Sequence, residues 1–381
     1  MKIIFFTDNM GSGGAQRQLS MLAVLLKKRG HDVTVITYNH GDFFEYFLEK
    51  NKINRIRIES KFKWRRPIEF AKILHKLKPH GVIAFQRAPS FYAELASLLK
   101  KNWQLIVSER SSVPSNQKNF LGKSIRLLHV IADVVTTNSH TNRLMIENTL
   151  KALRRKTVTI YNAVELDKFK PITGPSNQNI LRFIVLSSHK FGKNFEGLAH
   201  AVALLKKETG LPQFKIDWFG DEAPGWLTKD KELCQKYEVD DIIQFYPSTD
   251  KVIKELDQSD ALILSSLWEG LPNAVCEALS TGCPVLMSDV CDARNLVTER
   301  KTGFLFNPLS PQSIAEAMRQ FLYLPINERQ AMREAARLFA ERLFDSEYFA
   351  VRYEQLLQGH LLDPSTGLRH WPPQNLVMQR D

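Results

Sequence analysis

The first forty residues set out a strand, a glycine-rich turn, a helix and a second strand in that order. Residues 2–7 are almost wholly apolar, and Gly11, Gly13 and Gly14 lie in the turn that follows. Apolar residues then recur with helical spacing from Ala15 to Arg29, and residues 32–38 form a β-branched run. This order is typical of the βαβ unit of a parallel sheet, so we expect an α/β protein.

The same alternation recurs along most of the chain, with one break. The stretch 170–179 contains prolines and a glycine without periodicity, and we interpret it as a linker. The sequence therefore predicts an N-terminal domain at 1–169, a C-terminal domain at 180–343, a terminal helix within 344–360 and a loose tail at 361–381. Ligands of such sheets bind at the carboxyl ends of the strands. Further strands are expected at 81–85, 104–108, 134–138, 157–161, 181–187, 215–219, 242–245, 261–265 and 284–288.

Composition excludes several classes of protein. Hydrophobic residues make up 44% of the chain and charged residues 24%, as in ordinary folded domains. The four cysteines form no CxxC pair, so neither a zinc site nor a disulfide framework is expected. The N-terminal apolar run is too short for a signal peptide, and no run approaches the ~18 apolar residues of a spanning helix. We therefore expect a cytoplasmic location.

Positive charge is concentrated in the first part of the chain. Residues 1–162 hold 28 Lys and Arg against 11 Asp and Glu, whereas the remaining residues hold 24 against 30. This indicates an anionic partner surface, with a merely well-solvated basic exterior as the alternative. Motifs of nucleic-acid-binding proteins are lacking, so no nucleic-acid partner is expected. Aromatic and basic residues alternate at Lys61, Lys63, Trp64, Arg65 and Arg66, which favours an anionic membrane surface.

Two segments have features of phosphate binding. Gly13 and Gly14 precede a helix, where a backbone can approach a ligand closely, although a plain tight turn is the alternative. In the segment 265–279 a strand ends, a turn follows and a helix begins near Asn273. The first N–H groups of that helix could hold a diphosphate, and Glu269 and Glu277 could accept sugar hydroxyls on either side. The alternative is a pair of solvated surface acids.

These motifs, taken in order, resemble the family-4 retaining glycosyltransferases with their E-x7-E region. The resemblance runs from about Met1 to Leu357 and implies a GT-B fold. In that fold, two Rossmann-like domains face each other and the C-terminal helix crosses back to the N-domain. The matching stretches are Gly11–Gln16, Asn138-Ser139, Tyr161–Val164, Lys193-Asn194, Phe219–Asp221, Glu269–Val285 and Thr302–Phe304.

The resemblance implies a role for each matching residue. Glu277 would bind the donor ribose, Glu269 the donor sugar, and Lys193 the departing diphosphate. Asn273 and Ala274 would supply backbone donors to that diphosphate. The other donor-binding residues implied are Gly13, Gly14, Gly220, Asp221, Tyr246, Gly270 and Leu271.

Two positions depart from the family pattern. The arginine usually found five residues before the lysine is replaced by Ser188, and Lys190 is the candidate for the second positive charge. A histidine usually found at the end of an N-domain strand is missing, and Glu109 or Arg110 would take over its role. The alternative for these residues is a surface ion pair.

The expected function is retaining transfer of a sugar from a nucleotide-sugar to a lipid-linked glycan, in surface polysaccharide synthesis. A UDP-linked donor is favoured by analogy, and neither a metal nor a cofactor is expected. The enzyme would associate peripherally with the inner face of the membrane. Alternatives are a soluble acceptor, a nucleotide-sugar epimerase of the same fold, or a non-catalytic partner subunit.

Overall fold

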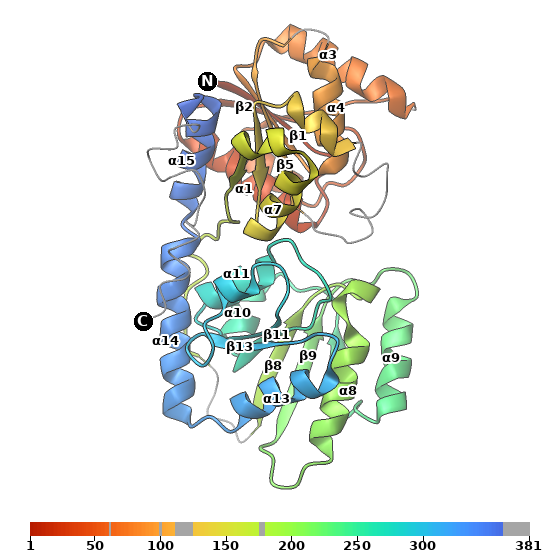
Figure 1. Cartoon of the computed structure of the whole chain (residues 1–381), viewed down its shortest axis with the longest axis vertical. Coiled ribbons are helices and arrows are strands. Elements are labelled where there is room, and N and C mark those ends of the chain that lie inside the picture. Colours follow the sequence, from red (N-terminus) through yellow and green to blue (C-terminus); the bar gives the residue numbers. More distant parts are fainter. Residues whose placement is uncertain (61, 99–100, 111–124, 175–179, 361–381) are drawn as a thin grey trace. The chain divides into compact units, whose positions relative to one another are not determined.

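The computed structural model describes residues 1–60, 62–98, 101–110, 125–174 and 180–360 (Figure 1). The chain forms two compact units: unit 1 is Met1–Ala163 with the chain from Ser346 onward, and unit 2 is Val164–Asp345. The expected linker belongs to unit 2 where it is described, because the Asp257 carboxylate accepts hydrogen bonds from the N–H groups of residues 172–174 at 2.9–3.2 Å. The expected tail lies outside the described residues.

Unit 1 is built on a parallel sheet that is buried on both faces. Ile3 and Phe5 point into one core and Ile4 and Phe6 into the other, as expected of a sheet covered on both sides. In sheet order the strands are β3 (Asn54–Arg57), β2 (Asp32–Thr37), β1 (Lys2–Phe6), β4 (Gly81–Phe85), β5 (Gln104–Glu109), β6 (Val134–Thr137) and β7 (Thr157–Thr159).

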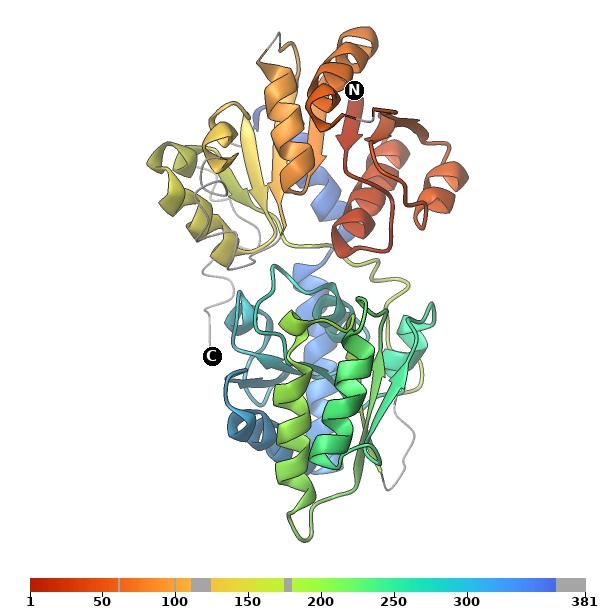
Figure 2. The same ribbon diagram turned by 90° about the vertical axis from the view of Figure 1, so that its right-hand side faces the viewer.

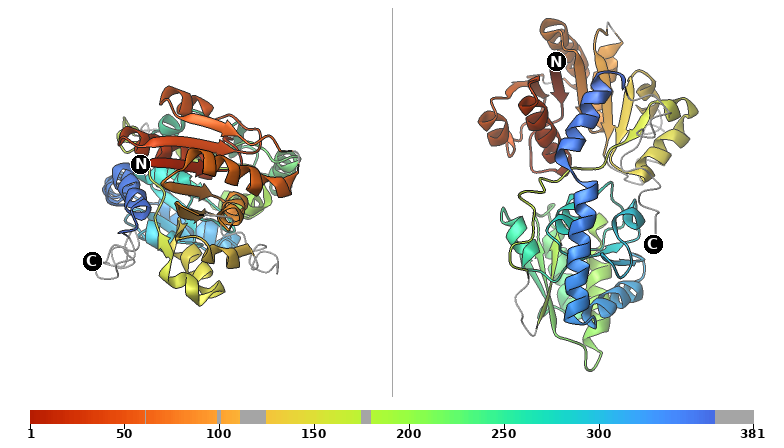
Figure 3. Two further views of the ribbon diagram at one scale, coloured as in Figure 1. Left: turned by 90° about the horizontal axis from the view of Figure 1, so that it is seen from above. Right: turned by 90° about the vertical axis from the view of Figure 1, so that its left-hand side faces the viewer.

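Helices cover both faces of this sheet. α15, whose range matches the expected terminal helix, packs against α1 and β5, so the chain returns to unit 1 (Figure 3, right). α3 and α4 pack on the other face. The helices of unit 1 are α1 (Gly14–Lys28), α2 (Glu45–Lys50), η1 (Lys63–Arg65), α3 (Arg66–Leu77), α4 (Arg87–Ser97), η2 (Leu128–Val130), α7 (His140–Thr149), η3 (Lys151–Arg155) and α15 (Ser346–Leu357).

Unit 2 repeats this plan. α8, α9 and α13 cover one face of its sheet, with α8 beside α9 in Figure 2. In sheet order the strands are β10 (Ile243–Tyr246), β9 (Phe214–Phe219), β8 (Leu181–Leu186), β11 (Ala261–Leu264), β12 (Val285–Ser288) and β13 (Gly303–Phe306). The helices are η4 (Phe191–Lys193), α8 (Phe195–Lys206), α9 (Trp226–Tyr237), α10 (Val252–Asp257), α11 (Asn273–Ser280), α12 (Ala293–Leu296), α13 (Pro311–Leu322) and α14 (Ile326–Leu343).

Both sheets are parallel and Rossmann-like, which confirms the predicted α/β architecture. The strand order reverses between β1 and β4 in unit 1 and between β8 and β11 in unit 2. Ligands of doubly wound sheets bind at the carboxyl ends of such strand pairs. Sequence reasoning missed the edge strands β3 and β13; only β3 is polar, with the sequence Asn-Arg-Ile-Arg. No helix in the described part of the chain is long and apolar enough to span a bilayer.

Candidate active site

The reversal point of unit 2 brings two of the predicted catalytic residues into contact. Lys193 lies in η4, which follows β8, and Glu269 lies in the turn that follows β11. The Lys193 ammonium is 2.6 Å from the Glu269 carboxylate, and each side chain keeps about a sixth of its surface exposed. The pair is therefore sheltered but reachable, at the edge of the sheet where the topology predicts a ligand.

Lys190 adds a second positive charge to this pair. Burial lowers the pKa of Lys190, the neighbouring Lys193 charge lowers it further, and Glu269 opposes both effects. Two ammonium groups and one carboxylate leave a net positive charge at this point. An anion arriving between the two lysines would relieve their mutual repulsion.

Backbone contacts fix the loop that carries both lysines. Ser265 donates from Oγ to the Lys193 carbonyl at 2.9 Å, and the Leu267 N–H donates to the Gly192 carbonyl at 2.9 Å. A Cβ on Gly192 would lie 2.7 Å from the Trp268 ring, so this close approach requires glycine. The end of β11 thus holds the end of η4 directly.

The predicted diphosphate-binding turn leads into α11. Asn273 and Ala274 form the start of this helix, where the positive end of the helix dipole lies. Glu277 is buried in the second turn, with 5% of its surface exposed, and Leu271 is buried too. The Gly270 carbonyl accepts a short contact from Cys291, which braces the turn.

Three of the other predicted donor-binding residues, Gly220, Asp221 and Tyr246, lie at the neighbouring strand ends. The Gly220 N–H donates to the Tyr246 carbonyl at 3.1 Å, and Ser248 donates to Asp221 at 2.6 Å. A Cβ on Gly220 would lie 1.9 Å from the Ser187 carbonyl, which only glycine avoids. The residues predicted for unit 2 therefore share the carboxyl edge of β10, β9, β8 and β11.

Two buried hydroxyl groups at this edge have no hydrogen-bond partner among the described residues. Ser187 comes directly after β8 and Ser266 is the second residue after β11, and the two residues are 9% and 1% exposed. Buried polar groups are normally satisfied by protein or by water. Both hydroxyls are therefore available to a ligand or to bound water at the reversal point.

In unit 1 the predicted glycine loop lies after β1. Gly13 caps α1 with an extended backbone, and Gly14 opens the helix. The preceding residues form a polar network in which Asp8 accepts hydrogen bonds from the Asn9 N–H at 2.8 Å and from Gln16 at 3.0 Å. This network holds the loop at the reversal point of the unit 1 sheet.

The two residues expected to replace the family histidine are held within unit 1. Glu109 is 4% exposed and lies 3.0 Å from Arg126 and 3.3 Å from His129, which in turn lies 2.5 Å from Glu94. Glu109 therefore does form an ion pair, but the pair is buried, whereas the alternative was a pair on the surface. Arg110 donates to Asn162, and its guanidinium lies 4.5 Å from the centre of the Phe85 ring.

The pKa values of Glu109 and His129 agree with a buried ion pair between charged side chains. Burial alone would raise its pKa, but the hydrogen bond from His129 and the charges of His129 and Arg126 outweigh burial and hold the pKa at about 2. Burial likewise opposes the positive charge of His129, yet its hydrogen bonds to Glu109 and Glu94 raise its pKa to about 9.

The segment predicted to contact a membrane is mostly exposed where the structure describes it. Trp64 is 63% exposed beside Lys63 and Arg65, whereas Arg66 lies against the Tyr38 ring at 4.3 Å. Lys61 lies outside the described residues. Exposed aromatic residues also gather at α2, and only the structure shows that this helix follows the carboxyl end of β2. They are Phe43, Tyr46 and Phe47, with exposed fractions of 69%, 66% and 41%.

Sequence reasoning also missed Gln86. It follows β4 at the reversal point of unit 1, with φ 74° and ψ 164°, a conformation found essentially only for glycine. The Thr7 hydroxyl donates to its side-chain oxygen at 3.4 Å. Strain of this kind clusters at functional sites, so Gln86 joins the candidate residues. Its sequence context gives no signal, because only the backbone angles reveal the strain.

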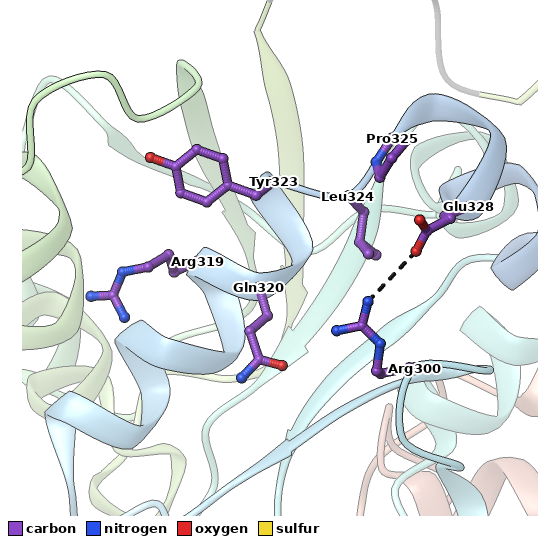
Figure 4. Close-up of a pocket in the computed structure, with 7 residues that line it drawn as sticks. All are labelled: Arg300, Arg319, Gln320, Tyr323, Leu324, Pro325 and Glu328. Atoms are coloured by element: carbon purple, nitrogen blue, oxygen red, sulfur yellow. Dashed lines mark ion pairs between the residues drawn. The ribbon is translucent and has the colours of Figure 1, made fainter.

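A hollow of about 300 Å³ lies away from the predicted site residues of unit 2, on the side where β13 begins. It lies between the turn before β13 and the end of α13 (Figure 4). Arg300 and Glu328 form an ion pair of 3.6 Å across it. The hollow contains none of the predicted site residues. Among the described residues, no group of three acidic, histidine or cysteine side chains is arranged to hold a metal ion.

Comparisons with known proteins agree with this arrangement. The family model for group 1 glycosyl transferases matches residues 168–339, and the model for glycosyltransferase family 4 matches residues 12–168. The chain superposes on HepE from Anabaena, solved in complex with UDP and glucose, with a TM-score of 0.82 and 18% identity over 94% of this chain and 100% of that one.

Two curated relatives are named for defined reactions. One is the N-acetylgalactosamine-N,N'-diacetylbacillosaminyl-diphospho-undecaprenol 4-alpha-N-acetylgalactosaminyltransferase of Campylobacter jejuni, 24% identical over 84% of this chain and 90% of the relative. The other is the lipopolysaccharide 1,6-galactosyltransferase of Escherichia coli, 31% identical over 44% of each chain. With two Rossmann-like units and family models that together match residues 12–339, the chain belongs to the family-4 glycosyltransferases of GT-B fold.

Proposed function

We propose that the protein transfers a sugar from a nucleotide-sugar, with UDP as the favoured nucleotide, to a lipid-linked glycan in surface polysaccharide synthesis. The observation that supports this most is the group formed by Lys190, Lys193 and Glu269 at the reversal point of unit 2. The names of the two curated relatives support the class of acceptor, a lipid-linked glycan, and the class of pathway, surface polysaccharide synthesis. The proposed transfer is retaining and needs no metal ion.

The chemistry follows from where charge develops. Breaking the bond between the anomeric carbon and phosphate leaves positive charge on the sugar ring and negative charge on the diphosphate. The two ammonium groups and the start of α11 are fixed in place before the reaction, so they stabilise the departing diphosphate without reorganising. The exchange of partners precedes this step: when the donor binds, Glu269 leaves Lys193 to accept the sugar hydroxyls, and Glu277 accepts the ribose hydroxyls.

The acceptor is proposed to attack from the side of the leaving group, with the departing phosphate taking its proton. In unit 1, Gln86 is a candidate to contact the reacting groups, and Gly13 and Gly14 remain candidates for the phosphate. The exposed aromatic residues of α2 and η1 are proposed to lie in the interface of an anionic membrane, where the lipid-linked acceptor is found.

Exchange of Lys193 tests this function. Lys193→Ala should lower transfer roughly 100-fold or more, because a charge-stabilising group of the transition state is lost. Transfer is measured by mass spectrometry of extracted lipid-linked glycan, with a panel of UDP-sugars as donors. A Lys193→Ala rate equal to that of the parent would contradict the mechanism, and turnover without any acceptor would indicate an epimerase.

A matched control is available in the same unit. Lys206 makes a lysine–carboxylate pair of 2.7 Å with Asp241 at the far end of α8, close to the length of the Lys193–Glu269 pair. Lys206→Ala should leave transfer unchanged. Equal losses in the two variants would mean that the effect of Lys193→Ala is not specific to the site.

A further inference from the structure

His189 and Asp230 form a buried pair directly beside the proposed diphosphate site. His189 immediately precedes Lys190, and Asp230 lies on α9; both are almost fully buried, with 1% and 3% of their surfaces exposed. The His189 Nδ1 atom is 2.8 Å from the Asp230 carboxylate. Because an ionised carboxylate only accepts hydrogen bonds, Nδ1 is the donor.

His189 is held on several sides. Its ring stacks on Trp218, with centroids 5.4 Å apart and an angle of 23°, and meets Phe245 edge-on at 5.3 Å. Its backbone N–H donates to the Asp221 carbonyl at 2.9 Å, and its carbonyl accepts from the Ala223 N–H at 3.1 Å. The residue therefore ties the lysine-bearing loop to the loop that follows β9.

This anchor determines where Lys190 points. Lys190 has an extended backbone, with φ −167° and ψ 158°, and successive side chains of an extended segment point to opposite sides. With His189 fixed toward Asp230 and the aromatic rings, Lys190 is directed to the side of Lys193 and Glu269, the two charges that act on it. Lys190 is exposed, and without this anchor the repulsion between like charges would turn its ammonium group away from Lys193.

We propose that the His189–Asp230 pair is a positioning device that sets Lys190 beside Lys193, so that two ammonium groups meet the donor diphosphate. The inference rests on the proposed function, since it assumes a nucleoside diphosphate ligand. Neither His189 nor Asp230 touches that ligand; both act through Lys190.

A double-mutant cycle on UDP affinity, measured by calorimetry, tests the proposal. Asp230→Ala should weaken UDP binding by about tenfold in the parent chain, an ordinary coupling for residues that act through one another. In a Lys190→Ala background the same change should have little effect. In a Lys206→Ala background it should again cost about tenfold, because that lysine lies outside the site.

Substitutions of His189 separate positioning from general stability. His189→Asn places an amide N–H near the position of Nδ1 and should keep most of the UDP affinity. His189→Phe keeps a ring between Trp218 and Phe245 but has no donor, and it should behave like Asp230→Ala. If Asp230→Ala does not fold, the UDP affinity of His189→Phe replaces it in the cycle. Melting temperatures are recorded for every variant.

The outcomes distinguish the inference from the proposed function. If the parent binds UDP and the losses from Asp230→Ala and Lys190→Ala simply add, the positioning role is overturned and the proposed function stands. The same holds if His189→Asn and His189→Phe lose affinity equally. If the parent binds no member of a panel of nucleoside diphosphates that includes UDP and GDP, the proposed function is overturned together with the inference.

Discussion

The two units share one plan but use their charged residues differently. At the carboxyl edge of unit 2, Lys193 and Glu269 form a sheltered but partly exposed pair, and Lys190 is an exposed residue whose pKa both of their charges affect. At the corresponding edge of unit 1, Glu109 is enclosed by Arg126 and His129. In unit 2 the charges lie at the reversal point, after β8 and β11, and remain partly solvated; in unit 1 the enclosed charge lies one strand away from the reversal point, at the end of β5.

The difference teaches that strand topology gives the location of a site, while burial determines what its residues do. A charge that is fully enclosed and paired contributes to folding, and its loss leaves an uncompensated partner. A charge that remains partly solvated can exchange its partner for a substrate. We therefore propose that unit 2 carries the donor chemistry and that unit 1 contributes its exposed aromatic surface.

The largest effect that would sharpen this comparison is expected from Glu109→Gln. Removing one charge from the buried group should lower the stability of unit 1 by about 3 kcal/mol, because Arg126 and His129 lose the negative charge that they share. Urea unfolding measures this, and transfer by the folded fraction should change little. Glu208→Gln, which breaks an ion pair with Arg319 that is about a third exposed, should cost at most about 1 kcal/mol. A transfer defect with unchanged stability would return Glu109 to catalysis.

The second largest effect is expected on membrane binding by the exposed aromatic residues of unit 1. Replacing Phe43 and Trp64 together with serine should weaken binding to anionic vesicles by about tenfold or more, because two exposed rings no longer enter the interface. Vesicle sedimentation at physiological salt measures this. Leu309→Ser, an 80% exposed residue of unit 2, serves as the control. Equal binding by all three proteins would remove the membrane surface from the proposal.

The buried charged group around Glu109 and His129 should make the stability of unit 1 depend on pH. The pKa of His129 is raised to about 9 in the folded chain, above its ordinary value of 6.5. Its stabilising contribution is therefore complete below about pH 6.5 and is lost as the pH rises through about 9. Glu94, Glu109 and Arg126 are the charged groups that contact it or Glu109.

Scanning calorimetry should show a fall in the melting temperature by several degrees between about pH 7 and pH 9.5. His129→Gln should show a smaller fall over that interval, because the group that loses its proton is gone. An identical fall in both proteins would place the titrating group elsewhere.

The smallest expected effect concerns strain at Gln86. Gln86→Gly should raise stability by about 1 kcal/mol, because glycine adopts this backbone conformation freely, and should lower transfer if the side chain contacts substrate. Lys78→Gly is the matched control, since Lys78 has φ 48° at the end of α3, away from the strand ends. Stabilisation of both variants with full transfer would leave Gln86 without a role in the reaction.

The sequence alone predicted the two parallel sheets, the terminal helix and the segment 265–279, because alternating apolar periods and glycine turns are local signals. The fold class and family that it indicated are confirmed. Edge strand β3 was not predicted, because its residues are mostly polar and only partly buried.

Only the tertiary structure decided which charges serve the fold and which face a ligand. Glu109 is paired with residues 17 and 20 positions away, and His189 with one 41 positions away. The local sequence around Glu109 and around Glu269 gives no sign of this difference. Burial and partner choice arise from contacts between distant segments, and these form only when the strands and helices pack.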